Sequence, residues 1–340
     1  MHRKLPKILI TGGASFIGSE FTRQLINRGT KYKVIVVDKL TYAADLSRLA
    51  EVKGKFKFYK VDICNVAQVE KIFQKEKPEI AVHFAAESHV DRSIIDSGEF
   101  VKTNIQGTQV LLDASRCSKV KKFIHISTDE VYGDIKKGRF YETTPLAPSS
   151  PYSASKAAAD LLVKSYIRTF KFPAVIVRPS NNYGPWQYPE KFIPVIIYKA
   201  LKNDLIPVYG KGLNVREWLH VQDCADAILT IVKKGRIGEI YNVGSGNERK
   251  NIDLVKNILY LLGRPLDLIS YVQDRPGHDL RYSLDSSKIR KELNWKPQVS
   301  FEKGLIDTVG WYRRNLPWLE KKVFYLKGYW GKVYKEKKCL

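Results

Sequence analysis

The chain has 340 residues, of which 44% are hydrophobic and 27% are charged, and these proportions exclude a disordered chain and are typical of a globular protein. No apolar run approaches the ~20 residues that a membrane-spanning helix needs, so no membrane span is expected. The net charge of +23 is spread over the whole length without any nucleic-acid-binding motif, so we expect an attraction for anionic small molecules and no nucleic-acid partner.

The amino-terminal segment and the cysteines indicate a cytoplasmic protein. Residues 1–4 are basic, but the apolar stretch Ile8 to Ile10 is too short for a secretory signal and runs into a glycine turn. The four cysteines lie far apart with no paired spacing. We therefore expect reduced thiols, no disulfide framework and no metal site.

The first half of the chain alternates short strand-like runs with helical stretches, which is typical of βαβ units and predicts a doubly wound, Rossmann-type parallel sheet in an α/β fold. The predicted strands are Lys7 to Thr11, Lys33 to Asp38, Lys57 to Asp62, Ile80 to Ala85, Lys122 to Ser127 and Ala174 to Arg178. The predicted helices include Gly18 to Asn27, Val66 to Lys75, Glu99 to Cys117 and Pro151 to Thr169. The last of these is opened by a serine cap and a first-turn proline.

Beyond Arg178 the chain is punctuated by proline and glycine, which predicts a smaller, loop-rich α/β lobe that binds the substrate. We expect a Rossmann domain in residues 1–183 and about 222–243, and the substrate lobe in 184–221 and 244–320. A basic aromatic tail follows in residues 321–340, where seven lysines are mixed with five aromatic residues. Such a segment is more often a solvated extension than a membrane or partner contact.

A glycine turn joins the first strand to the first helix. Gly12, Gly13 and Gly18 stand where the backbone turns tightly and approaches a pyrophosphate at a helix N-terminus. Asp38 ends the second strand, 20 residues beyond Gly18, where a carboxylate accepts hydrogen bonds from the adenosine ribose hydroxyls. This carboxylate favours NAD over NADP, although Lys39 slightly weakens the discrimination. A glycine turn used only for packing is the alternative.

Gly12, Ser15 and Gly18 are spaced as in the GxxGxxG turn of the extended short-chain dehydrogenases, which this turn resembles, with serine in place of the middle glycine. If the position requires positive φ, serine costs about 1 kcal/mol of strain. A hydrogen bond from its hydroxyl to a phosphate oxygen would recover part of that cost.

Two groups of residues have the chemistry of a catalytic site. Tyr152 and Lys156 lie one turn apart on a predicted helix, and a nearby ammonium stabilises a phenolate, so the pair predicts a general base. Thr128, Asp129 and Glu130 follow a strand at its carboxyl end, where doubly wound folds bind ligands. Adjacent carboxylates push their pKa values apart and so supply one proton donor and one acceptor. A solvated strand end is the alternative.

The chain resembles the nucleotide-sugar 4,6-dehydratases of the extended short-chain dehydrogenase family, from the first strand to about Trp311. The matching segments are His83 to Ser93, Thr128 to Glu130, Arg178 to Pro185, Tyr188 to Lys191, Asn214 to His220 and Asp274 to Asp279. The Asp129–Glu130 pair selects within the family, because related epimerases, decarboxylases and GDP-mannose dehydratases tend to place a different residue before or at the acid.

The resemblance implies conversion of dTDP-glucose to dTDP-4-keto-6-deoxyglucose in deoxysugar (rhamnose-type) biosynthesis. It makes Tyr152 the base that takes the 4-hydroxyl proton while hydride leaves carbon 4 for NAD. Glu130 then takes the carbon 5 proton, Asp129 protonates the departing 6-hydroxyl, and the hydride returns to carbon 6. Thr128 would hydrogen-bond the 4-oxygen, and Lys156 would hold the nicotinamide ribose and tune Tyr152.

The resemblance also implies a set of binding residues. The expected cofactor contacts are Gly12, Gly13, Ser15, Phe16, Ile17, Gly18, Asp38, Lys39, Leu40, Thr41, Asp62, Ile63, Phe84, Ala85, Ala86, Ser88, Thr103, Tyr152, Lys156 and Asn182. The expected substrate contacts are Ser88, Thr128, Asn181, Lys191, Phe192, Pro207, Val208, Tyr209, Arg216, Asn251, Asp274, Arg275 and His278. Arg216 suits a diphosphate because a guanidinium presents a rigid fork of donors to phosphate oxygens.

Other functions remain open at this point. A UDP-glucose 4,6-dehydratase shares nearly all of these motifs, and a UDP-sugar 4-epimerase or decarboxylase would use Tyr152, Lys156 and NAD without needing Glu130. A non-catalytic sensor of NAD or sugar nucleotides is disfavoured, because it would not need the four catalytic side chains. A homodimer built on a helix bundle that includes Glu99 to Cys117 and Pro151 to Thr169 follows from the resemblance alone.

Overall fold

The computed structural model describes residues 5–326, 328 and 330. Within them, seven parallel strands form a central sheet in the order β10-β6-β5-β4-β1-β2-β3. The strands are β1 (Lys7–Thr11), β2 (Lys33–Asp38), β3 (Phe56–Lys60), β4 (Ile80–His83), β5 (Lys122–Ile126), β6 (Ala174–Pro179) and β10 (Ile240–Val243). Most of them are continuous runs of buried Val and Ile, as expected for a parallel sheet that is covered on both faces. The Rossmann-type fold is confirmed.

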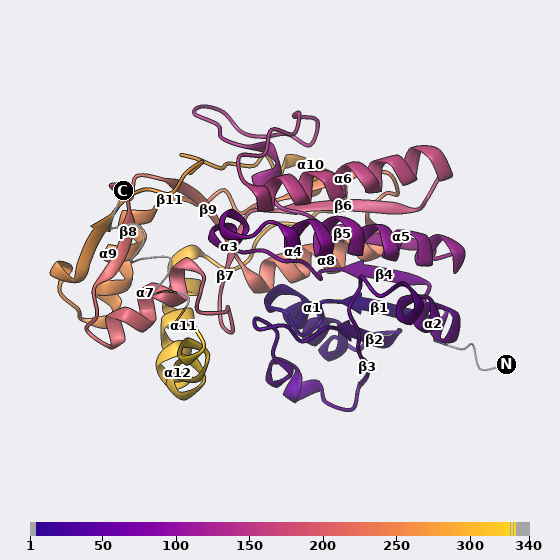
Figure 1. Ribbon diagram of the computed structural model, residues 1–340, viewed down its shortest axis with the longest axis horizontal. Helices are drawn as coiled ribbons and strands as arrows, with labels where there is room; N and C mark the ends of the chain where they lie inside the picture. The colour runs from indigo at the N-terminus through magenta and orange to yellow at the C-terminus, as the bar shows by residue number, and fades with distance from the viewer. Residues whose placement is uncertain (1–4, 327, 329, 331–340) are drawn as a thin grey trace.

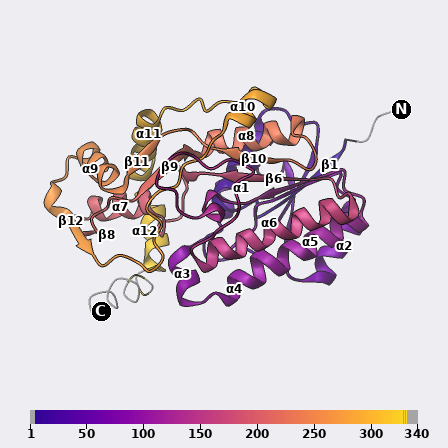
Figure 2. The ribbon, with the colours of Figure 1, turned by 90° about the horizontal axis from the view of Figure 1, so that it is seen from above.

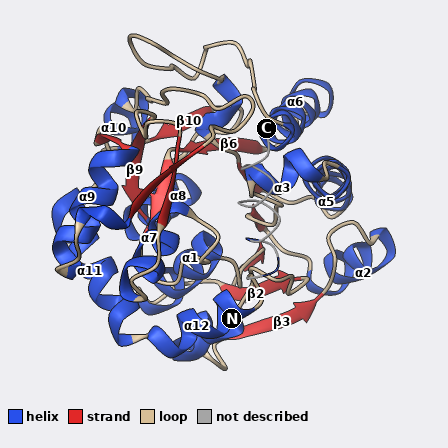
Figure 3. Ribbon diagram, turned by 60° about the vertical axis from the view of Figure 1, so that its left-hand side comes forward, coloured by secondary structure: helices blue, strands red, loops and turns tan. Residues whose placement is uncertain are grey.

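Helices cover both faces of this sheet, as Figures 2 and 3 show. One face packs against α1 (Phe16–Asn27), α8 (Val221–Lys234) and α10 (Ser287–Leu293). The other face packs against α2 (Val66–Glu76), α5 (Gly107–Cys117) and α6 (Pro151–Phe170). The predicted cap of α6 is present, because Ser150 and Ser153 form a reciprocal capping box with Pro151 in the first turn.

The predicted helix Glu99 to Cys117 is interrupted. It forms α4 (Gly98–Phe100), the π-helical segment η2 (Val101–Gln106) and α5. A π-helical turn rotates the residues within it relative to a regular helix. Here it places Asn104 where its side chain bonds the backbone N–H and C=O of Glu87, at 2.9 Å each, and the hydroxyl of Ser155 at 2.8 Å.

The smaller lobe lies beside the carboxyl ends of the strands and contains two small sheets, β11-β9-β7 and β12-β8 (Figure 1). Its strands are β7 (Asn181–Tyr183), β8 (Ile206–Tyr209), β9 (Val215–His220), β11 (Glu248–Lys250) and β12 (Ile269–Val272). Its helices are α7 (Phe192–Leu201), α9 (Asn251–Leu262), α11 (Phe301–Arg314) and α12 (Leu316–Phe324). Shorter helices elsewhere are η1 (Leu46–Val52), α3 (Val90–Ile95), η3 (Asp129–Tyr132) and η4 (Leu266–Leu268).

Packing departs from the expected division of the chain at two places. Strand β7, whose residues 181–183 were assigned to the Rossmann domain, pairs with β9 in a sheet of the smaller lobe. The segment 244–320 was assigned to the substrate lobe, but Ile289 and Leu293 of α10, with Trp295 after it, pack in the core of the Rossmann domain. The helix contacts β10 and α8, so its apolar side is buried there rather than in the smaller lobe.

The start of the basic aromatic tail is not a solvated extension, contrary to expectation. Val323, Leu326 and Trp330 are buried in the core of the smaller lobe, because α12 and the turn after it present an apolar side to that core. Tyr329, Tyr334 and the remaining lysines beyond Lys322 lie outside the described residues. No helix in the described part of the chain is long and apolar enough to cross a membrane.

Candidate active site

The glycine turn between β1 and α1 brings three backbone segments close together. Gly12 has a φ of +68°, and a Cβ there would lie 2.5 Å from the backbone nitrogen of Ala85. A Cβ on Gly13 would lie 2.7 Å from the side chain of Val36, and one on Gly18 would collide with the carbonyl of Gly12. Glycine is therefore required at these positions. Because glycine has no side chain, the N-terminus of α1 stays open to a pyrophosphate.

Ser15 is not strained. Its φ is −73°, so the position needs no positive φ, and the strain that the sequence suggested is absent. Its hydroxyl caps α1 by accepting a hydrogen bond from the backbone N–H of Gly18 at 3.3 Å. Serine here is thus a favourable N-cap residue.

Asp38 ends β2, as predicted, and is almost fully buried. Its carboxylate accepts backbone N–H bonds from Ala14 at 3.0 Å and Leu40 at 2.8 Å, while burial raises its pKa overall. Lys39 turns away from it and pairs with Asp62 at 2.7 Å. Because the Lys39 ammonium is paired with Asp62, it does not neutralise the Asp38 carboxylate. Asp38 can therefore accept hydrogen bonds from ribose hydroxyls and disfavours a ribose phosphate.

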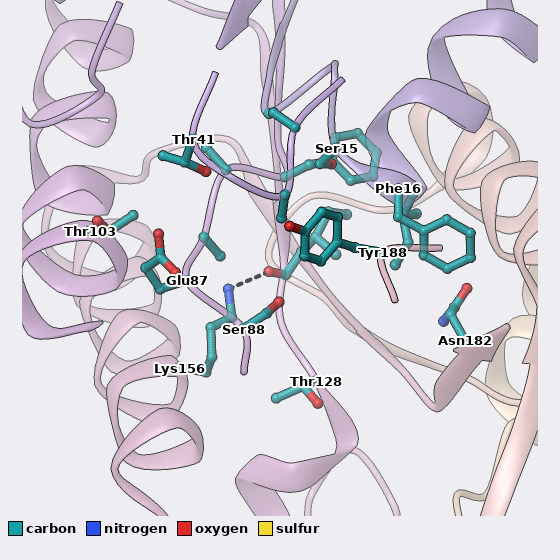
Figure 4. A pocket seen from close by; sticks show the side chains of 18 of the residues that line it. Ser15, Phe16, Thr41, Glu87, Ser88, Thr103, Thr128, Lys156, Asn182 and Tyr188 are labelled. Carbon is teal, nitrogen blue, oxygen red and sulfur yellow. Dashed lines mark hydrogen bonds between the residues drawn. The ribbon is translucent and has the colours of Figure 1, made fainter. Parts of the chain in front are cut away.

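A cavity of about 290 Å³ opens along the carboxyl ends of the strands (Figure 4). Of the expected cofactor residues, the lining includes Gly12, Ser15, Phe16, Ile17, Asp38, Lys39, Thr41, Asp62, Ile63, Phe84, Ala85, Ala86, Ser88, Thr103, Tyr152, Lys156 and Asn182. Gly13, Gly18 and Leu40 do not line it, because the two glycines pack against backbone and Val36 behind the turn.

The cavity wall also contains residues that the motifs did not single out. They are Ala43, Ala44, Val61, Glu87, Ile126, Ser127, Pro179, Ser180, Gln187, Tyr188 and Glu190. A signal was present in the sequence, because Glu87, Pro179, Ser180, Tyr188 and Glu190 lie within the segments that carry the family resemblance. Val61, Ile126 and Ser127 lie within predicted strands. Figure 4 shows Glu87 and Thr103 on one side of the cavity and Phe16 and Asn182 on the other.

Tyr152 and Lys156 lie in the first two turns of α6, and both are buried. The ammonium of Lys156 donates a hydrogen bond to the carbonyl of Ile126 at 2.6 Å, and burial lowers its pKa to about 8. The pKa of the Tyr152 phenol is raised by burial and by the nearby Glu130 carboxylate. The expected lowering by Lys156 is not seen, because desolvation and a neighbouring negative charge set the direction of the pKa shift, while the Lys156 ammonium bonds the Ile126 carbonyl.

Asp129 and Glu130 begin η3, at the end of β5, where Thr128 caps the turn. Asp129 is 1% exposed, and burial together with the Glu130 and Glu217 charges raises its pKa well above the usual range. Burial also raises the pKa of Glu130, but Arg275, Arg216 and Lys191 act in the opposite direction. Burial thus raises the pKa of both carboxyl groups, and their surroundings differ, because the strongest neighbouring charge is a carboxylate for Asp129 and an arginine for Glu130.

A second cavity of about 180 Å³ adjoins the first and shares Glu130, Asn181 and Lys191 with it. Of the expected substrate residues, it is lined by Ser88, Asn181, Lys191, Phe192, Pro207, Val208, Tyr209, Arg216, Asn251, Arg275 and His278. Thr128 lines only the first cavity. Lining residues that were not among the expected substrate contacts include His89, Val90, Asp91, Val195, Ile196, Trp218 and Tyr282, of which the first three and Trp218 lie within the matching segments.

Asp274 lies outside both cavities and acts through a neighbour. Its carboxylate pairs with Nδ1 of His278 at 2.5 Å and so orients that ring against the second cavity. Burial and the nearby Arg275 lower the pKa of His278 to about 4. His278 is accordingly neutral at pH 7 and lines the cavity as a hydrogen-bonding group.

Arg216 is held tightly at the wall of the second cavity. Its guanidinium donates to the carbonyls of Val215, Asp279 and Leu280 and stacks 4.2 Å from the ring centre of Tyr282. A guanidinium has five N–H donors, so these bonds leave some free for a diphosphate. With Lys191 and Arg275, the cavity has three cationic side chains for an anionic ligand.

The fold and the site define an extended short-chain dehydrogenase: a Rossmann-type domain with a glycine turn, a Tyr–Lys pair, and a second cavity formed by an appended lobe. The residues present fit NAD, because the turn leaves room for a pyrophosphate and Asp38 faces the ribose position. In the described residues, no cluster of His, Cys, Asp and Glu is arranged to hold a metal ion.

Known proteins similar to this chain indicate which member of the class it resembles. A family model described as GDP-mannose 4,6 dehydratase matches residues 9–308. The chain is 48% identical to the dTDP-glucose 4,6-dehydratase of Neisseria meningitidis serogroup B, over 92% of this chain and 94% of that one. It is 47% identical to dTDP-glucose 4,6-dehydratase 1 of Escherichia coli K12, with the same coverage.

Solved structures of similar fold include a dehydratase of the same name and an epimerase. DesIV, a dTDP-glucose 4,6-dehydratase from Streptomyces venezuelae with NAD and TYD bound, superposes with a TM-score of 0.90 at 46% identity, covering 93% of this chain and 99% of that one. A UDP-glucose 4-epimerase from Thermotoga maritima gives a TM-score of 0.85 at 33% identity, covering 91% and 99%. The chain belongs to the dTDP-glucose 4,6-dehydratase family.

Proposed function

We propose that the protein is an NAD-dependent 4,6-dehydratase that converts dTDP-glucose to dTDP-4-keto-6-deoxyglucose. The observation that carries this proposal is the Asp129–Glu130 pair: Asp129 is buried in the wall of the first cavity, and Glu130 lines both cavities and lies near Tyr152. Elimination of water across carbons 5 and 6 needs one group to take a proton and another to give one. Two carboxyl groups in different electrostatic surroundings supply both.

NAD, when bound, would accept a hydride from carbon 4 and return it to carbon 6, so it is recycled in each turnover. Tyr152 takes the proton of the 4-hydroxyl, and Thr128 holds the 4-oxygen. The positive charge of an oxidised nicotinamide would stabilise the phenolate and so oppose the rise that burial causes in the pKa of Tyr152. Lys156 positions the nicotinamide ribose from the next turn of α6.

Glu130 is the base at carbon 5. Arg275, Arg216 and Lys191 oppose the effect of burial on its pKa, and so favour the ionised form that a base requires. Asp129, whose pKa is raised by burial and by the Glu130 charge, is the acid that protonates the leaving 6-hydroxyl. The same cations in the second cavity neutralise the diphosphate of the sugar nucleotide.

We assign thymidine as the base, in a pathway to deoxysugars of the rhamnose type, because the curated relatives at 47–48% identity are named for dTDP-glucose. UDP-glucose is the alternative substrate. A UDP-sugar 4-epimerase on the same scaffold has no use for a base at carbon 5, so the role of Glu130 separates the two reactions.

The test is to incubate the purified protein separately with dTDP-glucose and UDP-glucose, without added NADH, and to follow each sugar nucleotide by mass spectrometry. We expect loss of one water from dTDP-glucose, and a rate at least about 100-fold lower in Glu130→Gln, because a positioned general base contributes about 10²–10⁴-fold. Glu99→Gln, an exposed change on α4, is the matched control. Unchanged mass with formation of a galactose isomer would assign the protein to the epimerases instead.

We further propose a homodimer built through α5 and α6, which lie side by side on an outer face in Figures 2 and 3. Leu161 and Phe170 of α6 and Val101 of η2 are exposed apolar side chains that such a bundle would cover. A monomer in sedimentation at assay concentration would rule it out. A cytoplasmic location and the two-domain division of the chain, with α10 moved to the Rossmann domain, are also proposals.

A further inference from the structure

Residues 41–45, which we call the cofactor loop, form one wall of the cofactor cavity. Thr41, Ala43 and Ala44 line the cavity directly. Asp45, the last residue of the loop, lies outside the lining, and its backbone N–H bonds the carbonyl of Ala14 in the glycine turn at 3.0 Å. The position of Asp45 therefore sets how the loop closes against the turn that receives the pyrophosphate.

The side chain of Asp45 is held by α12, which comes from the far end of the chain (Figures 1 and 2). One carboxylate oxygen accepts hydrogen bonds from Nε1 of Trp318 at 2.9 Å and from the ammonium of Lys322 at 2.8 Å. The Asp45 and Lys322 side chains are each only 16% exposed. Burial alone would raise the pKa of Asp45, but the bonds from Lys322, Ser47 and Trp318 lower it overall.

The surroundings make this contact rigid. The ring of Trp318 packs 5.3 Å from Trp186 and 5.5 Å from Trp311, so its N–H is fixed in direction. Arg48 is fully buried and donates hydrogen bonds to the carbonyls of Ala14, Ala43 and Trp186. It therefore connects the glycine turn, the cofactor loop and the segment that leads into the smaller lobe. The Asp45–Lys322 ion pair thus connects the cofactor loop and α12, which are each held in place by other contacts.

We propose that α12 is a latch that holds the cofactor loop closed on bound NAD, with Lys322 and Trp318 acting as positioning residues through Asp45. The inference rests on the proposed function, in which NAD is recycled within each turnover and no step requires its release. A latch that slows NAD release then costs the cycle nothing. It also gives the start of the basic aromatic tail a function within the molecule.

The experiment uses full-length protein loaded with NAD, freed of excess cofactor, and diluted without sugar nucleotide; released NAD is measured over time. We expect Lys322→Met to release NAD about tenfold faster, since truncating one partner of a largely buried, hydrogen-bonded charge pair mainly raises the dissociation rate. Lys322→Arg should keep release near the wild-type rate. Lys321→Met is the matched control, because Lys321 is exposed on the same helix and forms no ion pair with any described residue.

A double variant tests the route through Asp45. Asn is also a good N-cap residue, so Asp45→Asn keeps the cap of η1 while removing the charge. Combining it with Lys322→Met should release NAD no faster than the faster single variant. Additive effects, wild-type release from Lys322→Met, or equal acceleration by Lys321→Met would each overturn the latch. Failure of the wild-type protein to bind NAD at all would instead refute the proposed function.

Discussion

Asp160 lies one turn beyond Lys156 on α6 and is completely buried, and its carboxylate pairs with Arg178 at 2.8 Å. Its negative charge opposes the effect of burial on Lys156, whose pKa is about 8. We therefore predict that Asp160→Asn lowers the pKa of Lys156 and moves the alkaline limit of activity to lower pH. The sign follows because a lysine that loses a nearby carboxylate gives up its proton more readily.

The magnitude follows from the geometry. Side chains at i and i+4 place these two charges about 6 Å apart, and an effective dielectric of about 20 then gives about 3 kcal/mol, or about 2 pKa units. Allowing for relaxation, we expect a shift of about 1–2 units. At pH 7 the charged fraction of Lys156 would fall from about nine tenths to between about one tenth and one half.

The assay is the pH profile of kcat/KM for dTDP-glucose, measured between about pH 6 and pH 9.5 at saturating NAD. Asp160→Glu keeps the negative charge, so the alkaline limit of its pH profile should stay near that of the wild type, even if the longer side chain lowers the rate. Asp226→Asn removes a carboxylate from α8, on the opposite face of the sheet, and should leave the limb unchanged. A folded Asp160→Asn protein, judged by circular dichroism, with an unmoved alkaline limb would refute the reasoning.

Two further predictions concern the glycine turn. Gly12→Ala should abolish NAD binding in equilibrium dialysis and destabilise the fold by about 1–3 kcal/mol, because a Cβ would lie 2.5 Å from the nitrogen of Ala85 at a φ of +68°; retained binding would show that the turn relaxes. Ser15→Ala should cost about 1 kcal/mol in urea unfolding by removing the cap, whereas Ser15→Gly should cost only a few tenths. Greater stability of Ser15→Gly than of the wild type would mean that the serine is strained after all.

The sequence was sufficient where chemistry is local. The predicted strands of the first half end within one or two residues of the observed ones, and so do the predicted helices, except for Glu99 to Cys117, which is interrupted. The glycine turn joins β1 to α1, Asp38 ends β2, and Tyr152 and Lys156 lie one turn apart on α6, as expected. Most of the expected binding residues line one of two adjoining cavities. The position of these residues in the fold depends on spacing along one strand, turn or helix, which the order of residues determines directly.

Tertiary structure decided whatever depends on contacts between distant segments. The φ of Ser15 follows from how the turn packs, the pKa of Tyr152 from burial beside Glu130, and the position of Asp274 from its bond to His278. The packing of α12 against Asp45 joins residues more than 200 positions apart, and α10 packs against β10 and α8 of the Rossmann domain. Periodicity reports which side of a helix is apolar but not which surface covers it, so only the folded chain shows where such helices pack.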